Sequence, residues 1–397
     1  MKKGLSLVLA GVLICMMLTA CGKTNTNNNT GNTPGKQEET AGTGTTGEQA
    51  TEAPKAEDPA AEPLKVVYLV NGNLGDKGFY DSAASGLYRM RDELGADIKV
   101  IEMGRDETSY EGHFLDVSEQ DWDIIIAGTW SVKEVAQNTA VQYPDKKYVF
   151  FDSDVDRGLV TDGNMMGVTY NSNQGAFMAG VLAAQMLDSG DAKIDASQRT
   201  LGFIGSMDVA NINDFLVGYL EGVAYVDPKI KVIPSYVGSF EDVPKCLEMT
   251  TQLYNQGAQI VYAPASQSIL GAATAASNVD KYLIACDQDL YTQLKDENPE
   301  IAKNILTSTL KNVGDSLVTA VKGIADGSMT CDQTYSLGLD SGAVGLAYND
   351  NFNSIVTEDI KANLEAVKDK IIKGEITVSS AMQMTTDEVS ALRDSMK

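Results

Sequence analysis

A loop near residue 75 carries acidic and aromatic side chains close together. Between Asn71 and Asp81 stand a second carboxylate, Asp76, and two aromatic residues, Phe79 and Tyr80. Aromatic rings offer a flat apolar face, and carboxylates accept hydrogen bonds from hydroxyl or N–H groups. This combination suits a sugar or a nucleobase rather than a phosphate, which the carboxylates would repel. The alternative is that Asp81 is only a helix N-cap and that Phe79 only covers a sheet edge.

Further candidates of the same chemistry stand at or soon after other apolar runs of the chain. They are Trp130, Asp152, Phe215, Asp287 and Lys311. One aspartate after a strand is usually a solvated turn or a cap. Several carboxylates, aromatic residues and a lysine at such positions together indicate a ligand-binding cleft.

Short β-rich runs alternate with amphipathic stretches from Leu64 onward, and these elements must position the candidates. The expected strands are Lys65–Val70, Ile98–Glu102, Ile124–Ala127, Tyr148–Asp152 and Met166–Thr169, then Leu201–Ile204, Val232–Val237, Ile260–Ala263 and Leu283–Cys286. Nearly continuous apolar strands separated by helices are typical of parallel sheets covered on both faces. We therefore expect an α/β fold of two doubly wound lobes, with the ligand beyond the carboxyl ends of the strands.

The length of the chain also indicates two lobes rather than one core, because roughly 330 residues follow Leu64. Crossovers between the lobes are expected near Tyr170–Asn173 and near Ile305. The prediction assigns residues 64–171 and 305–332 to the first lobe and residues 172–304 to the second. Residues 333–397 receive no lobe assignment.

The N-terminus has the pattern of a bacterial lipoprotein signal. Lys2 and Lys3 precede an almost wholly apolar run to Leu18, which is followed by Thr19-Ala20-Cys21. The pattern predicts cleavage after residue 20, lipid on Cys21, and a location on the extracytoplasmic face of the cell membrane. A lone membrane anchor is the weaker reading, since the run is shorter than the ~20 residues of a spanning helix. Residues 22–63 lack Val, Ile, Leu, Met, Phe, Tyr and Trp, which predicts a disordered tether.

Composition argues against several classes of partner and cofactor. The formal net charge of −24 disfavours binding to nucleic acid and to anionic lipid, so contact with the membrane is expected through the lipid anchor only. Of five cysteines, Cys246, Cys286 and Cys331 lie in the folded part without CxxC spacing. They predict buried thiols rather than a disulfide framework or a zinc site, and we expect neither metal nor cofactor.

Catalytic motifs are not evident, so we expect a protein that is not an enzyme. The chain has one histidine, His113, and no G-x-S-x-G elbow, zinc helix or phosphate loop. The run from Asp152 to Gly158 begins like a calcium loop, but its glycine comes one residue late and Gly163 replaces the closing acid. Paired carboxylates would also serve a glycosidase, yet on binding lobes they more often accept hydroxyl groups.

Several of these segments resemble the basic membrane protein (PnrA-like) family of lipoproteins, which are nucleoside-type substrate-binding proteins. Gly75–Asp81 is similar to the family's G-D-x-S-F-N-D, and Gly202–Tyr219 to its G-F-x-G-G-M-D…R-F-x-x-G-Y. Lys281–Asp289 resembles K-Y-x-I-G-V-D-x-D-Q, and Thr307–Lys311 resembles T-S-x-x-K. The order and spacing match over most of residues 64 to about 345. The resemblance implies a type I periplasmic-binding fold, two lobes joined by a hinge, that captures a purine nucleoside for an ABC permease.

Site roles also follow from the resemblance, residue by residue. It implies that Phe79 and Phe215 stack on the base. It implies polar contacts from a second set, which comprises Asp76, Asp81, Asp152, Asp287 and Lys311. Tyr80 and Trp130 complete the expected ligand-binding set, although Tyr80 replaces the motif asparagine and Gly78 the motif serine. A sugar as ligand, or a sensing receptor of the same fold, remains an alternative.

Overall fold

The computed structural model describes residues 62–395 of the chain. The predicted signal peptide, Cys21 with its predicted lipid, and the predicted tether up to residue 61 therefore lie outside the described residues. Among residues 62–395, no helix is both long and apolar enough to cross a lipid bilayer.

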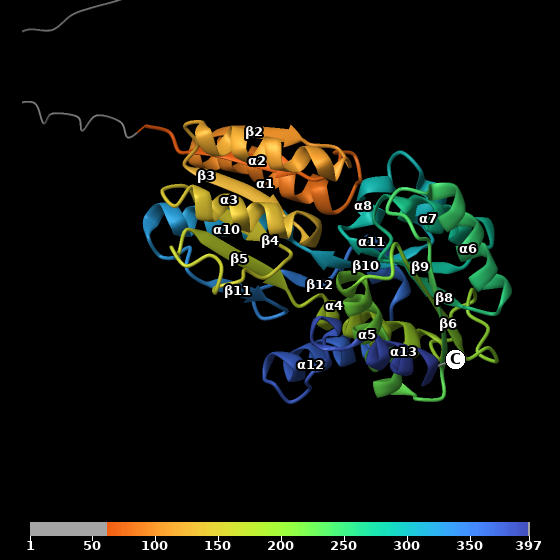
Figure 1. Cartoon of the computed structure of the whole chain (residues 1–397). Coiled ribbons are helices and arrows are strands. Elements are labelled where there is room, and N and C mark those ends of the chain that lie inside the picture. Colours follow the sequence, from red (N-terminus) through yellow and green to blue (C-terminus); the bar gives the residue numbers. More distant parts are fainter. Residues whose placement is uncertain (1–61, 396–397) are drawn as a thin grey trace, which may run out of the picture. The chain divides into compact units, whose positions relative to one another are not determined.

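Two six-stranded sheets form the framework (Figure 1). The first has the order β11-β5-β4-β3-β1-β2, all parallel. Its strands are β1 (Lys65–Val70), β2 (Asp97–Glu102), β3 (Ile124–Gly128), β4 (Lys147–Phe151), β5 (Met165–Tyr170) and β11 (Thr334–Leu337). β3 reads Ile-Ile-Ile-Ala-Gly and is buried at every position, as expected for a central strand covered on both faces.

The second sheet has the order β12-β10-β9-β8-β6-β7, with β12 antiparallel to β10. Its strands are β6 (Thr200–Gly205), β7 (Lys231–Tyr236), β8 (Ile260–Tyr262), β9 (Tyr282–Asp287), β10 (Ile305–Lys311) and β12 (Val344–Leu346). The predicted α/β fold of two doubly wound, parallel-dominated sheets is confirmed.

Helices pack against both sheets. The first sheet carries α1 (Phe79–Leu94), α2 (Tyr110–Glu119), α3 (Lys133–Gln142) and α10 (Val313–Asp326). The second carries α4 (Ser172–Met186), α5 (Ala210–Val226), α6 (Val243–Asn255), α7 (Ile269–Asn278), α8 (Leu290–Leu294), α9 (Pro299–Ala302) and α11 (Asp350–Ile355). We call the first sheet with its helices the first lobe, and the second sheet with its helices the second lobe.

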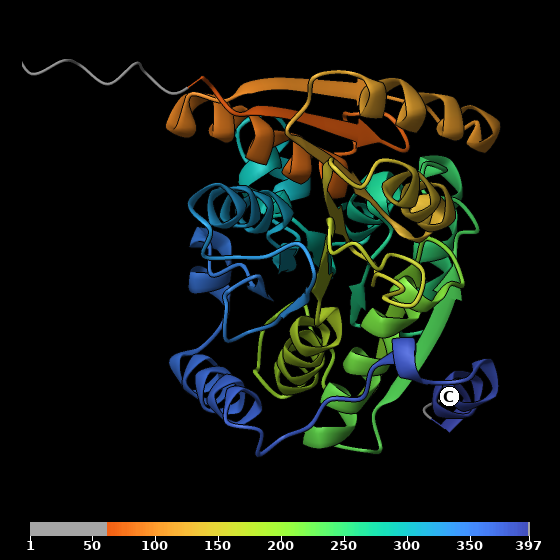
Figure 2. The same ribbon diagram turned by 60° about the vertical axis from the view of Figure 1, so that its left-hand side comes forward.

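The C-terminal segment, which the sequence left unassigned, visits both lobes. β11 pairs with β5 of the first sheet, and β12 then pairs with β10 of the second. α12 (Glu358–Ile372) packs on α4, and α13 (Thr386–Ser395) packs on α5. Figure 2 shows this segment in blue, running from α12 across the second lobe to α13.

One predicted boundary is wrong. Residues 305–332 were expected to open the return to the first lobe, but residues 305–311 form β10 of the second sheet. It pairs in parallel with β9, where Leu310 stands opposite Asp287, and β12 covers its other edge. The chain therefore crosses at Asn312, immediately before α10, because β10 finds partners on both of its edges only in the second sheet.

Three connections join the lobes, and the first two are each hydrogen-bonded to the third or to the residue just before it. They are Asn171 before α4, Asn312 before α10, and residues 338–343 between β11 and β12. The Asn171 N–H donates to Leu337 O at 2.8 Å, and the Asn312 N–H donates to Ala343 O at 2.8 Å. This arrangement places the only backbone links between the lobes, within residues 62–395, beside each other.

Glycines allow α4 and α5 of the second lobe to touch backbone to backbone. A Cβ added at Gly222 would clash with the carbonyl oxygen of Phe177. We expect Gly222→Ala to lower the free energy of unfolding by about 1–3 kcal/mol, the usual cost of overpacking. Urea denaturation measures the change. The control is Gly112→Ala in α2, where an added Cβ meets nothing within 4 Å, and equal effects of the two changes would contradict the argument.

Candidate ligand-binding site

A cavity of about 310 Å³ lies between the carboxyl ends of the two sheets and is lined by both lobes. Its volume is within the range of small-molecule pockets. Seven of the nine expected ligand-binding residues line it: Phe79, Tyr80, Trp130, Asp152, Phe215, Asp287 and Lys311. The strand-end rule therefore located the cavity from sequence.

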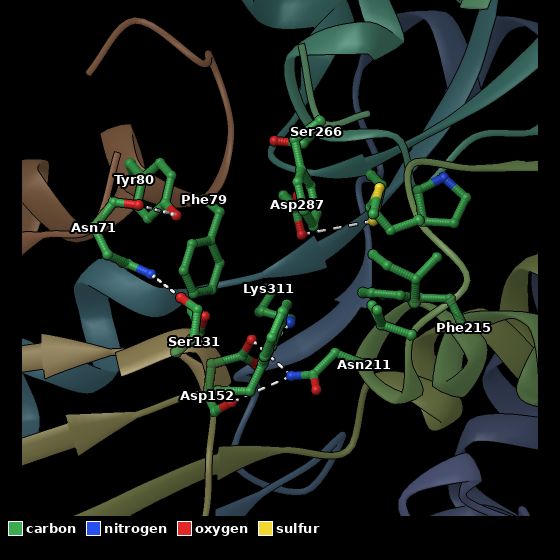
Figure 3. Close-up of a pocket in the computed structure, with 18 of the residues that line it drawn as sticks. Asn71, Phe79, Tyr80, Ser131, Asp152, Asn211, Phe215, Ser266, Asp287 and Lys311 are labelled. Carbon is green, nitrogen blue, oxygen red and sulfur yellow. Dashed lines mark hydrogen bonds and ion pairs between the residues drawn. The ribbon is translucent and has the colours of Figure 1, made fainter. Parts of the chain in front are cut away.

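Two phenylalanine rings from opposite lobes flank a lysine in this cavity (Figure 3). The Lys311 Nζ lies 5.3 Å from the ring centroid of Phe79 and 5.2 Å from that of Phe215. Phe79 opens α1 of the first lobe and is supported by Phe151, whose centroid is 5.4 Å away. Phe215 lies in α5 of the second lobe and packs on Tyr262 at 6.4 Å. The paired faces suit a flat ring system that enters between the lobes.

The lysine forms a buried ion pair across the lobes. Its Nζ lies 2.9 Å from Asp152 Oδ1, and the two side chains are 6% and 12% exposed. Asn211 of α5 donates to Asp152 Oδ2 at 3.1 Å. Burial by itself lowers the pKa of Lys311, but the carboxylates of Asp152 and Asp287 more than offset this and leave the pKa raised. The lysine therefore stays charged, and a first-lobe carboxylate is held by two donors of the second lobe.

Two strand-end aspartates have left-handed backbone conformations. The φ angle is +57° at Asp152, just after β4, and +70° at Asp287, the last residue of β9. Residues other than glycine rarely adopt this region, and such outliers cluster at functional sites. The two carboxylates thus leave the strand direction at equivalent positions of the two sheets.

Asp287, a partly buried acid of the cavity, has less compensation from hydrogen-bond donors than Asp152. Lys311 directs its hydrogen bond to Asp152, whereas Asp287 Oδ1 lies 3.6 Å from the Cys286 thiol, a weak donor. Burial raises the pKa of Asp287 to about 6, against the lowering effect of Lys311. Its carboxylate oxygens can therefore accept hydrogen bonds from hydroxyl or N–H groups of a ligand.

Asp76 and Asp81, which were expected to contact the ligand, do not line the cavity. The Asp76 carboxylate accepts the backbone N–H groups of Gly78, Tyr80 and Asp81 at 3.0–3.1 Å. Asp81 accepts the N–H groups of Gly75 and Lys77, both at 2.8 Å. The lone pairs of both carboxylates are used to shape the loop that presents Phe79. Burial raises the pKa of Asp76, which its backbone hydrogen bonds oppose.

Several lining residues were missed by sequence reasoning. They include Asn71, Arg105, Ser131, Asn211, Phe240 and Ser266. Asn71 directly follows β1 and donates to Ser131 Oγ at 2.8 Å, and Tyr80 OH donates to the Asn71 carbonyl at 3.1 Å. Arg105 and Phe240 stand in the connections after β2 and β7, and Ser266 opens a short 3-10 helix after β8. The strand-end rule applied to every strand would have found them.

The described residues give little support for a metal site or for a reactive cysteine. Between residues 62 and 395, no group of three or more His, Cys, Asp or Glu side chains is placed to hold a metal ion. Cys246, Cys286 and Cys331 are buried and free, as predicted. Burial raises the pKa of the Cys246 thiol to about 11, so this thiol is unreactive.

A comparison with known proteins assigns the family. The model of the family described as "ABC transporter substrate-binding protein PnrA-like" matches residues 64–381. The chain belongs to this family. It is 26% identical to Basic membrane protein A of Borreliella burgdorferi over 323 residues, 81% of this chain and 89% of that one. Basic membrane protein D of the same species is 25% identical over 340 residues, 84% of this chain and 92% of that one.

Solved structures agree on the fold. An ABC transporter solute-binding protein from Aeropyrum pernix superposes with a TM-score of 0.71 at 22% identity, covering 84% of this chain and 98% of that one. A second, from Conexibacter woesei, gives a TM-score of 0.64 at 20% identity over 80% and 99% of the two chains. The predicted type I periplasmic-binding fold and the predicted family are confirmed. The protein therefore has a solute-binding role for an ABC transporter, and its family is one of substrate-binding proteins rather than enzymes.

Proposed function

We propose that this protein captures a purine nucleoside, or a small ligand of similar chemistry, between its lobes and delivers it to an ABC importer. The observation that carries the proposal is the pair of Phe79 and Phe215 on opposite lobes, each about 5 Å from the same ammonium group. Stacking of a base on an aromatic side chain contributes ~1–3 kcal/mol. A base between both rings would bind each lobe.

The acids of the cavity favour a nucleoside over a nucleotide. Asp287 lines the cavity and is partly buried, and a carboxylate accepts two vicinal hydroxyl groups at once, as a ribose presents them. A phosphate would meet Asp152 and Asp287, while the two cations that line the cavity, Lys311 and Arg105, are already paired with carboxylates. Ligand contacts to both lobes would favour the closed state, which is the mechanism of capture.

The proposed place of action is the extracytoplasmic face of the cell membrane. Cys21 would carry the lipid, and residues 22–63 would give the binding lobes reach to the permease. The names of the Borreliella relatives, basic membrane proteins, support a membrane association.

A thermal-shift screen of the full chain tests the proposal. A ligand that binds only the folded state adds about 2.7 kcal/mol of stability at a hundred times its Kd. We expect guanosine, inosine or adenosine to raise the melting temperature, and ribose, free phosphate and guanosine monophosphate to leave it unchanged. A shift with monosaccharides and none with nucleosides would overturn the substrate class.

Removing either ring of the sandwich is expected to weaken binding. Phe79→Ala and Phe215→Ala should each cost ~1–3 kcal/mol of nucleoside affinity in calorimetric titrations, because each change deletes one stacking face. Tyr225→Ala is the matched control, since Tyr225 lies in the same helix as Phe215, is exposed, and packs on Phe177 away from the cavity. Unchanged affinity in both phenylalanine variants would exclude the sandwich.

A further inference from the structure

One arginine that lines the cavity bridges the two lobes. Arg105 follows β2 in the first lobe, and its guanidinium lies 2.6 Å from the carboxylate of Glu241 in the second. Its Cζ is 5.9 Å from the ring centroid of Tyr80, in its own lobe, and 5.7 Å from that of Phe240, in the opposite lobe. The guanidinium is thus held by one ring of each lobe and by an acid across the gap.

The exposure of its side chains distinguishes this bridge from the buried ion pair of Lys311 and Asp152. Arg105, Tyr80 and Phe240 all line the cavity, while Phe240 and Glu241 stand in the turn between β7 and α6. The side chains of Arg105 and Glu241 are 38% and 45% exposed, so the bridge lies where the cavity meets solvent. Each of these contacts joins two protein groups.

We propose that Arg105 is a latch that favours closed lobes by itself and slows the escape of a bound ligand. A planar guanidinium can stack on aromatic faces and pair with a carboxylate at the same time. A lysine ammonium is less suited to both interactions. Opening the lobes must separate Arg105 from Phe240 and Glu241 together. The latch therefore acts on the equilibrium between open and closed lobes, and on ligand only through that equilibrium.

The direct test measures the distance between the lobes with no ligand added. Spin labels are attached to noncanonical amino acids at positions 141 and 279, which are exposed and lie in α3 and just after α7. This labelling leaves the native cysteines unmodified. In the full chain, we expect Arg105→Ala to shift the distance distribution toward an open state. Glu241→Gln, which keeps the arginine between the rings, should give a smaller shift.

Arg89→Ala is the matched control, because Arg89 in α1 pairs with Asp315 in α10 within the first lobe. It should leave the distribution unchanged. The exchanged pair of Arg105→Glu with Glu241→Arg should recover part of the closed population. If Arg105→Ala and Glu241→Gln both give the wild-type distribution, no latch exists.

Release of guanosine, followed by stopped-flow fluorescence, is the second measurement, and it rests on the proposed function. We expect Arg105→Ala to speed dissociation by about tenfold with a smaller change in association, since most interface changes act on release. Equal dissociation rates in wild type and variant would contradict the latch. If guanosine fails to bind the wild type, the proposed nucleoside specificity fails, while the distance measurement still decides the latch.

Discussion

Lys311→Met is expected to cause the largest loss of both stability and binding. The change removes the cation from a buried pair and leaves the Asp152 carboxylate, 12% exposed, without its partner. Breaking a buried pair in this way costs about 3–5 kcal/mol of unfolding free energy. We also expect nucleoside affinity to fall by about 30-fold or more, because the charged donor next to both rings is lost. Urea denaturation and calorimetric titration measure the two effects.

A double variant separates the lost pair from a general packing defect. Asp152→Asn with Lys311→Met removes both charges, so we expect it to be more stable than Lys311→Met alone. Lys303→Met, which breaks an exposed pair with Glu300, should change neither property. If the double variant were no more stable than the single one, the charge argument would be wrong.

The affinity for a nucleoside is expected to fall in acid with a midpoint set by Asp287. Burial raises the pKa of this carboxyl to about 6, and the charged form is the acceptor of ligand hydroxyl groups. Protonation below pH 6 removes the acceptor, so Kd should rise about tenfold per pH unit once the pH is well below that pKa. Titrations from pH 5 to 8 measure the slope. Asp287→Asn should bind more weakly and lose this slope, whereas Asp154→Asn, at an exposed acid, should keep it.

The same carboxyl makes the ligand-free protein less stable as the pH rises. Between the usual value of 3.8 and about 6, the folded chain holds a proton on Asp287 that the unfolded chain has released. Unfolding free energy therefore falls with rising pH across this window, by an amount of about 3 kcal/mol in total. At pH 7 without ligand, we expect Asp287→Asn to be more stable than the wild type. A less stable variant would contradict this sign.

The fold could be predicted from sequence because its signals are local. Strands such as Ile124–Gly128 are apolar throughout, and only a sheet covered on both faces buries such a run. Residues 305–311 were assigned to the wrong lobe because their local pattern does not show which sheet they join. Their sheet is decided by pairing with β9, the preceding strand, and with β12, which follows only after α10 and β11.

The candidate site shows the same division between local and distant causes. Phe79 opens α1, Phe215 lies in the first half of α5 and Lys311 ends β10, and all three line the cavity. Asp76 and Asp81 belong to the same loop, but their oxygens are occupied by backbone N–H groups that the turn brings to them. Residue type and spacing do not reveal how many lone pairs the local backbone will use.

The sequence by itself determined two parallel-sheet lobes, the carboxyl ends of the strands as the place of the cavity, the family, and most of the expected side chains that line the cavity. Hydrophobic pattern and motif spacing carry that information, since both are written along a continuous stretch of chain. The tertiary structure decided which lobe holds β10, which acid stays uncompensated, and that Arg105 meets Phe240 and Glu241 across the cavity. Those outcomes depend on distances between segments far apart in sequence, and only packing of the two lobes sets such distances.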